Sequence, residues 1–143
     1  MARTTYKLSE TRTFGIEIEA YGVATSTLCD TLNAAGIDCQ VQGYNHTTVS
    51  FWKIVSDSSI QGPLSFELVS PPLRGADGVR QVETVCRVLA SLNVKVNKSC
   101  GLHVHHDAND LGLSHWKNLG KLYLKYEPTL DSLLPTSRRM GQN

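Results

Sequence analysis

The clearest pattern in the chain is an alternation of apolar and polar residues, which predicts β-strands with one buried face. In residues 13–20, Phe14 and two isoleucines alternate with Glu17 and Glu19. Successive side chains of a strand point to opposite faces of the sheet. We therefore expect a strand whose isoleucines are buried, while its two glutamates either face water or belong to a site.

The same alternation recurs in two later segments. Residues 65–70 place Glu67 in the opposite phase to its apolar neighbours, and Pro71 then ends the segment because proline cannot donate to a β-ladder. Residues 102–106 place His103 and His105 on the face opposite Leu102, Val104 and His106. Two imidazoles on one rigid face are a plausible start to a metal site, and His106 should lie outside it.

Three further strands are expected from shorter apolar runs between turn signals. Residues 37–41 and 49–55 are separated by a polar turn and are interpreted as a hairpin. Residues 94–96 are interpreted as the return partner of residues 102–106, which makes the latter an inner strand entered through a turn. We find no internal repeat.

Helices are predicted where apolar residues recur every three to four positions. Residues 26–36 should form a short helix ended by glycine, and residues 77–91 a longer one with Asp77 as its N-cap. A third helix should run from Ser114 to about residue 126, and Pro128 should restart the chain as a short helical segment up to residue 134. The third helix should pack inward through Leu119, Leu122, Tyr123 and Tyr126.

Composition fits a single domain over residues 1–143, with a loose lead-in at 1–12 and a polar tail at 136–143. The 143 residues are 41% hydrophobic, which is enough to bury a core. The formal net charge is +1 and the basic residues are scattered, so we expect no nucleic-acid partner. No apolar run approaches the roughly 20 residues that span a bilayer, so we expect no membrane role.

The cysteines indicate a reducing compartment. Cys29, Cys39, Cys86 and Cys100 have no close paired spacing, and the polar start of the chain does not look like a secretion segment. We therefore expect reduced thiols and a cytoplasmic location, which is the host cytoplasm for a phage-encoded protein.

A shared face for the polar strand residues would suit a divalent cation. Glu17, Glu19, Glu67, His103 and His105 all occupy the non-core phase of their predicted strands. Carboxylates and imidazole suit Mg²⁺ or Mn²⁺, and hard oxygen ligands leave room for phosphate oxygens in the coordination shell. The pattern favours nucleotide chemistry over structural zinc.

Five segments resemble, in order, a known family. They are FGIEIE at 14–19, WKIVSDSSI at 52–60, ELVSPPL at 67–73, CGLHVH at 100–105 and SRR at 137–139. One Glu-x-Glu is common by chance, but five ordered blocks over nearly the whole chain are specific. They resemble the phage and bacterial amidoligases, which are related to glutamine synthetase and glutamate–cysteine ligase.

The resemblance implies an α+β fold with a glutamine-synthetase-like antiparallel sheet and helices packed on one face. Its concave face would hold ATP and Mg²⁺ or Mn²⁺. The implied activity is ATP-dependent joining of a carboxylate to an amine, through an acyl phosphate, with small molecules or peptides as substrates. By this likeness the metal ligands are Glu17, Glu19, Glu67 and His103, and His105 contacts the nucleotide.

Three more residues gain expected roles from the resemblance. Arg138 or Arg139 would bind a phosphate or a substrate carboxylate through its planar guanidinium group. Asp57 would orient or deprotonate the amine, and the alternative is that it only caps a turn. Family members usually continue well beyond the Arg–Arg block. We therefore expect either an open site, one that a second subunit or a protein partner completes, or one that has lost catalysis.

Two other functions remain open at this point. The first is a non-catalytic, phage-type protein-binding module on the same fold. The second is a metal-dependent hydrolase, because His103, His105 and Asp107 loosely resemble a metallo-hydrolase motif. This second alternative leaves the Glu-x-Glu strand unexplained.

Overall fold

The computed structural model describes residues 11–139, apart from the side chain of Ser137. The chain divides into two compact units, Met1–Asp107 and Ala108–Asn143, which we describe separately. Most of the expected lead-in (1–10) and part of the expected tail (140–143) lie outside the described residues. The assignment of residues 1–143 to one domain stays a prediction.

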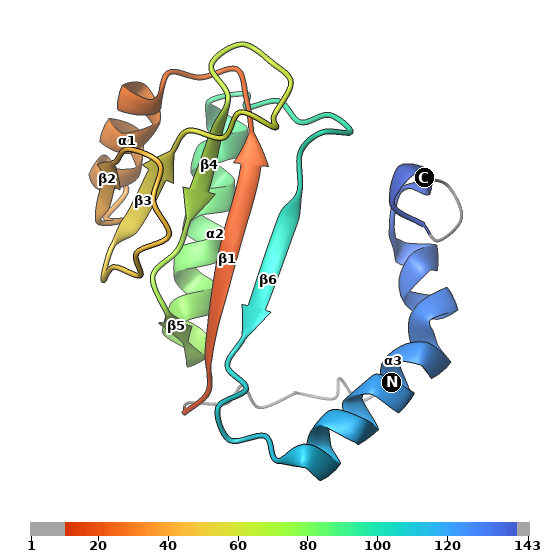
Figure 1. Cartoon of the computed structure of the whole chain (residues 1–143). Coiled ribbons are helices and arrows are strands. Elements are labelled where there is room, and N and C mark those ends of the chain that lie inside the picture. The colour runs from red at the N-terminus through yellow and green to blue at the C-terminus, as the bar shows by residue number, and fades with distance from the viewer. Residues whose placement is uncertain (1–10, 140–143) are drawn as a thin grey trace, which may run out of the picture. The chain divides into compact units, whose positions relative to one another are not determined.

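The first unit is built on a six-stranded sheet (Figure 1). β4, β5 and β6 all pair antiparallel with β1, and β3 pairs antiparallel with β4. The sheet and its helices confirm the predicted α+β class. The strands are β1 Thr13–Ala20, β2 Cys39–Val41, β3 Trp52–Val55, β4 Phe66–Val69, β5 Leu73–Arg74 and β6 Leu102–His106.

Strand register confirms that the polar residues share a face. Glu17 of β1 pairs with Val69 of β4 on one edge and with His103 of β6 on the other, and Glu19 pairs with Glu67. Directly paired residues point to the same side of a sheet. The side chains of the two β1 glutamates, Glu67 and His103 therefore project from one face.

β4 and β5 lie end to end along the same edge of β1. Between them, Ile16 N donates to Ser70 Oγ and Ser70 N donates to Ile16 O, both at 2.8 Å. Ser70 Oγ also donates to Pro71 O at 2.8 Å. The predicted end of the strand at the prolines is confirmed, whereas the short β5 beyond them was not anticipated.

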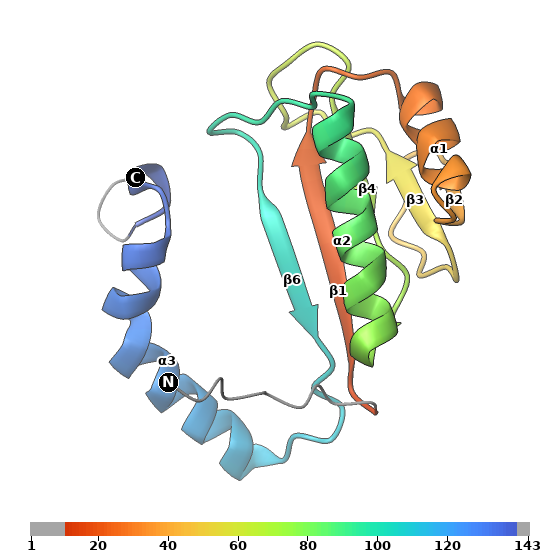
Figure 2. The same cartoon turned by 180° about the vertical axis from the view of Figure 1, so that it is seen from behind.

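Two helices cover the opposite, apolar face of this sheet (Figure 2). They are α1 Thr25–Ala34 and α2 Gly75–Ser91. The N-cap of α2 is Arg74, so the prediction of Asp77 as cap was wrong; its carboxylate lies in the first turn, where it suits the helix dipole. The fully buried residues at this interface include Leu28, Leu32, Ile54, Phe66, Leu68 and Val85.

The predicted hairpin of residues 37–41 and 49–55 is wrong, because β2 and β3 pair in parallel. Their connection is a long loop, residues 42–51, rather than the two to five residues of a typical hairpin loop. Trp52 N donates to Asp38 O at the start of both strands. The loop therefore folds back and lets the second strand begin beside the first.

The expected partner of β6 is also wrong. Residues 94–96 form only one isolated bridge, between Lys95 and Tyr21, and β6 pairs with β1. All five residues of β6 are exposed, so within residues 11–139 it is an edge strand rather than an inner one. Leu102 and Val104 are 66% and 51% exposed, because β6 extends beyond the cover of α1 and α2.

The second unit contains α3 Leu113–Leu133 and a 3₁₀ turn, Thr136–Arg138. Gly112, not Ser114, is the N-cap, and Pro128 lies inside the helix instead of restarting it. Leu119, Leu122, Tyr123 and Tyr126 were expected to pack inward but are 48–56% exposed, since the described part of this unit has no second layer to cover them. No helix within residues 11–139 has the length and apolar character needed to cross a bilayer.

Candidate metal site

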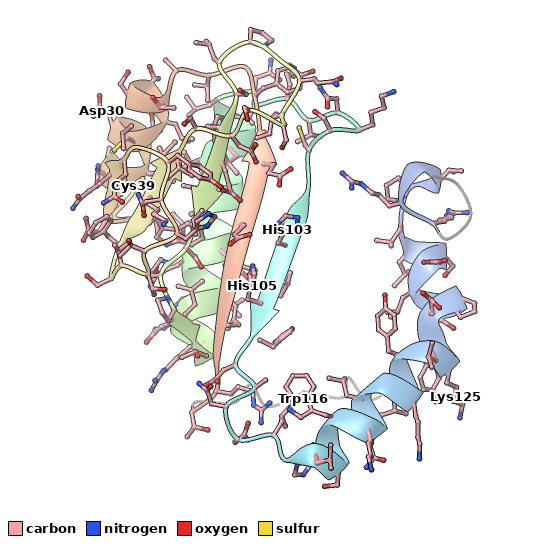
Figure 3. All side chains as sticks on the ribbon, in the orientation of Figure 1. Asp30, Cys39, His103, His105, Trp116 and Lys125 are labelled. Atoms are coloured by element: carbon pink, nitrogen blue, oxygen red, sulfur yellow. The ribbon has the colours of Figure 1, made fainter. Side chains whose placement is uncertain are left out.

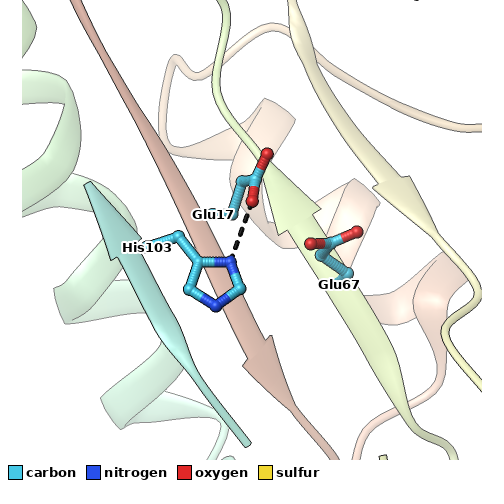
Figure 4. A group of neighbouring side chains, drawn as sticks. All are labelled: Glu17, Glu67 and His103. Atoms are coloured by element: carbon cyan, nitrogen blue, oxygen red, sulfur yellow. Dashed lines mark hydrogen bonds and ion pairs between the residues drawn. The ribbon is translucent and has the colours of Figure 1, made fainter. Parts of the chain in front are cut away.

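Three adjacent strands bring two carboxylates and an imidazole together on the open face of the sheet. Glu17 comes from β1, Glu67 from β4 and His103 from β6 (Figure 4). One potential ligand atom of each lies within 4.8 Å of the other two. His103 Nδ1 is 3.0 Å from Glu17 Oε2. An ion could take one donor from each strand, which is a rigid way to build a site.

A second group of potential ligands shares Glu67 with the first. One oxygen each of Glu19, Asp57 and Glu67 lie within 4.8 Å of one another. Asp57 comes from the loop after β3, where its Oδ1 accepts a hydrogen bond from Ser59 N at 2.7 Å. This turn-capping bond was the alternative considered for Asp57, and here it also fixes the carboxyl group beside two others.

Gly101, at the start of β6, holds Glu19 and leaves room for His103. Its N–H donates to Glu19 Oε2 at 2.7 Å, and Glu19 N donates to Gly101 O at 3.0 Å. A Cβ at this position would lie 2.9 Å from His103 Nε2 and 3.3 Å from Glu19 Oε2. Any side chain would therefore displace one of two potential ligands.

Opposite electrostatic surroundings act on Glu17 and Glu67. Burial by itself would raise the pKa of Glu17, but hydrogen bonds and charge from His103 and His105 bring this pKa below its ordinary value. The pKa of Glu67 is raised by burial and by the negative charges of Glu17, Asp57 and Glu19, which His103 only partly offsets. Burial and the neighbouring carboxylates therefore both disfavour the charged form of Glu67.

These side chains line a pocket of about 500 Å³. One wall carries Glu17, Glu19, Asp57, Glu67 and His103. The described lining residues include no lysine or arginine that could neutralise the four carboxylates. Ser56 and Ser58 also line the pocket and belong to the segment 52–60 that carries the resemblance. The sequence did not point to the remaining lining residues, Tyr44 and His46, because the loop 42–51 has no periodic signature.

The other predicted site residues lie around this pocket or in the second unit. Both His103 and His105 project from β6 (Figure 3), but His105 does not line the pocket; its Nε2 lies 3.2 Å from Glu17 Oε2. His106 pairs with Phe14 on the opposite face, as expected. Arg138 ends the 3₁₀ turn of the second unit, and Arg139, which caps that turn, donates from Nε to Leu134 O at 3.0 Å. The roles given to these residues stay predictions.

The geometry does not favour the hydrolase alternative. Within residues 11–139, no group of three or more potential ligands contains His105 or Asp107. The Glu-x-Glu strand, which that alternative left unexplained, supplies a ligand to each of the two groups.

Comparison with known proteins identifies a family for this chain. A family model described as "Putative amidoligase enzyme" matches residues 10–142, almost the whole chain. Comparison with curated proteins and with solved structures gave no match. Because the matched region spans almost the whole chain, the chain belongs to the amidoligase family.

Proposed function

We propose that this protein is an ATP- and Mg²⁺-dependent ligase that joins a carboxylate to an amine. The observation that carries the proposal is the pair of ligand groups that share Glu67 on the open face of the sheet. Membership of the amidoligase family supports an enzymatic role for that face. The ATP requirement follows the family resemblance, and the donor chemistry of the site supports the metal requirement.

The residues present fit a hard divalent cation. Apart from one imidazole the donors are carboxylate oxygens, which Mg²⁺ and Mn²⁺ prefer. Burial, and after it the negative charges of Glu17, Asp57 and Glu19, raise the pKa of Glu67, and a bound cation would favour its charged form. Glu17, Glu67 and His103 would hold one ion. Glu19, Asp57 and Glu67 would hold another, so the geometry favours a ligand role for Asp57 over the predicted role of orienting the amine.

Bound cations would supply neutralisation of the phosphate charge that develops during transfer. In the proposed reaction, a substrate carboxylate oxygen attacks the γ-phosphorus of ATP and ADP leaves, which forms an acyl phosphate. The amine nitrogen then attacks the acyl carbon, phosphate leaves with the bonding electron pair, and the nitrogen loses a proton. We keep His105 as a proposed nucleotide contact; its Nε2 lies 3.2 Å from Glu17 Oε2, and it does not line the pocket. We keep Arg138 and Arg139 as proposed phosphate or carboxylate contacts.

Isothermal titration calorimetry with ATP tests the nucleotide and metal requirements. We expect binding in excess Mg²⁺ and none in chelator. Glu17→Ala and His103→Ala should each abolish it, because each removes a ligand. Two matched controls should bind like the wild type. Glu83→Ala removes an exposed carboxylate from α2, and His106→Ala removes a β6 imidazole from the opposite face. If the wild type binds no ATP in Mg²⁺, the proposal fails.

A trapping assay separates ligation from simple nucleotide binding. The protein is incubated with Mg²⁺, ATP, hydroxylamine and a panel of amino-acid and peptide carboxylates. Ligation predicts a hydroxamate in equal amount to ADP for at least one carboxylate, because hydroxylamine captures the acyl phosphate. Binding of ATP with no turnover across the panel would instead support the non-catalytic binding module.

A further inference from the structure

The loop of residues 42–51 lies over the same face of the sheet as the metal ligands. Lys53 of β3 pairs with Val69, which pairs with Glu17, so all three side chains project from one face. Lys53 is nevertheless only 4% exposed. Its Nζ donates to Asn45 O and Asn45 Oδ1 at 3.0 Å and to Thr47 O at 2.8 Å. The loop therefore covers this part of the face and is attached to it.

Lys53 gives the loop a fixed shape. A buried ammonium group is costly unless its protons are hydrogen-bonded, and here all three have acceptors within the loop. Asn45 Nδ2 also donates to Gln42 Oε1 at 3.1 Å and to Gly43 O at 2.7 Å, and Thr47 N donates to Asn45 Oδ1 at 3.1 Å. These bonds preform the loop as a second wall of the pocket.

Tyr44 and His46 flank Asn45 on this wall, and both line the pocket. Tyr44 Oη is 3.0 Å from His46 Nε2, and their rings meet edge to face, with centroids 5.0 Å apart and planes at 79°. Tyr44 is 66% exposed, so much of its ring is open to a ligand. Neither residue belongs to the metal-ligand groups found in residues 11–139. Their place in the pocket therefore calls for another role.

The chemistry of this second wall suits a nucleobase better than a phosphate. An aromatic ring offers a stacking surface, and the hydroxyl and imidazole groups offer hydrogen bonds to a heterocyclic edge. The lining described here contains no lysine or arginine, which an anion would require without a metal. Phosphates would bind instead at the carboxylate wall through cations, which leaves the loop wall for the rest of the nucleotide.

We propose that Tyr44 and His46 bind the base of ATP, and that Lys53 is the positioning residue that holds them in place. This inference rests on the proposed function, because it requires a Mg²⁺-bound nucleotide in the pocket. It predicts that the loop contributes to binding of the nucleoside part of the ligand and not to binding of its phosphates.

Calorimetry with ATP and with inorganic triphosphate, both in excess Mg²⁺, tests this directly. Tyr44→Ala should weaken ATP binding about tenfold, which is within the range of base–aromatic stacking, and leave triphosphate binding unchanged. Tyr44→Phe should retain most of the affinity, because it keeps the ring. Val41 is an exposed β2 residue outside the pocket, so Val41→Ala is the control and should change the affinity for neither ligand.

Substitutions of Lys53 and of its acceptor Asn45 test the positioning role of Lys53. Lys53→Met and Asn45→Ala should each weaken ATP binding but not triphosphate binding. Asn45→Ala also serves as the test if Lys53→Met does not fold. In either background, adding Tyr44→Ala should lower the affinity for ATP only slightly further, since the loop no longer holds the ring in place. A fully additive effect of Tyr44→Ala would show that Lys53 does not position it.

The outcomes separate this inference from the proposed function. If wild-type protein binds neither ligand in Mg²⁺, the proposed function fails and the inference fails with it. If triphosphate binds and ATP binds no more tightly, or if Tyr44→Ala weakens both ligands equally, the nucleobase role is overturned while the metal and phosphate site stands.

Discussion

On one face of β1, Ile16 and Ala20 are buried beneath helices, while on the other face Glu17 and Glu19 remain 27% and 12% exposed in the same eight-residue strand. β4 repeats the contrast, with Phe66 fully buried next to Glu67. The apolar face is held by packing, whereas the pocket on the polar face brings four carboxylates together with no lysine or arginine among its described lining residues. Strand parity thus separates residues that fold the protein from residues that we propose bind a ligand.

Substitutions of two adjacent residues of β4 should give the largest difference between the two faces. Phe66→Ala should lower the free energy of unfolding by about 3–5 kcal/mol, because it leaves a cavity under the helices. Glu67→Ala should cost far less stability but remove Mg²⁺ binding, since both ligand groups contain Glu67. Urea denaturation measures the first effect and calorimetry the second. A Glu67→Ala protein destabilised as strongly as Phe66→Ala would contradict the separation.

A single methyl group at the start of β6 should produce the next largest effect. Gly101→Ala should weaken Mg²⁺·ATP binding by at least about tenfold, roughly 1.4 kcal/mol, because the added Cβ crowds His103 and Glu19. Gly120→Ala is the matched control, since a Cβ there meets no atom within 4 Å. Equal ligand affinity of the two variants would show that the close approach of Gly101 to these two side chains does not matter for the site.

The pH dependence of stability should have opposite signs at Glu17 and Glu67 in metal-free protein. The raised pKa of Glu67 means that its charged form destabilises the fold above the ordinary glutamate value of 4.5. Glu67→Gln should therefore raise the melting temperature at pH 7 by a few degrees at most, and the gain should vanish in acid. The lowered pKa of Glu17 means that its carboxylate adds stability above 4.5, which is lost as the pH falls through the folded pKa.

Glu17→Gln should accordingly lower the melting temperature at pH 7, with a difference that shrinks below pH 4.5. Thermal melts of both variants in chelator, from about pH 4 to about pH 8, make the comparison. Shifts of the same sign at neutral pH would mean that the two carboxylates do not differ as the geometry indicates. Adding Mg²⁺ should reverse the advantage of Glu67→Gln, because only the wild type gains a bound cation.

The sequence predicted which residues share the polar face but not what encloses it. The face on which Glu17, Glu67 and His103 lie depends only on alternation within each strand. It was therefore predicted correctly although some strand pairings were wrong. The parallel β2–β3 pair and the β1–β6 pair depend on long-range packing, which a local pattern does not encode. The prediction of α3 was wrong for a different reason, because its backbone remains helical through Pro128.

The loop of residues 42–51 also could not be placed beside the site from a local sequence pattern. Tyr44 and His46 follow no period, and they line the pocket from a loop whose Asn45 O and Thr47 O accept hydrogen bonds from Lys53 Nζ. Nothing within residues 42–47 indicates this contact. By contrast, Asp57 lies close to Glu19 and Glu67 at a position that the sequence had already singled out.

The central claim is that the shared face binds divalent cations through Glu67 and its neighbours. Anomalous diffraction from crystals of the full chain soaked in Mn²⁺ and a non-hydrolysable ATP analogue tests it most directly. We predict manganese peaks bounded by Glu17, Glu67 and His103 and by Glu19, Asp57 and Glu67. The absence of manganese from this face, or a peak bound instead by His105 and Asp107, would contradict the account.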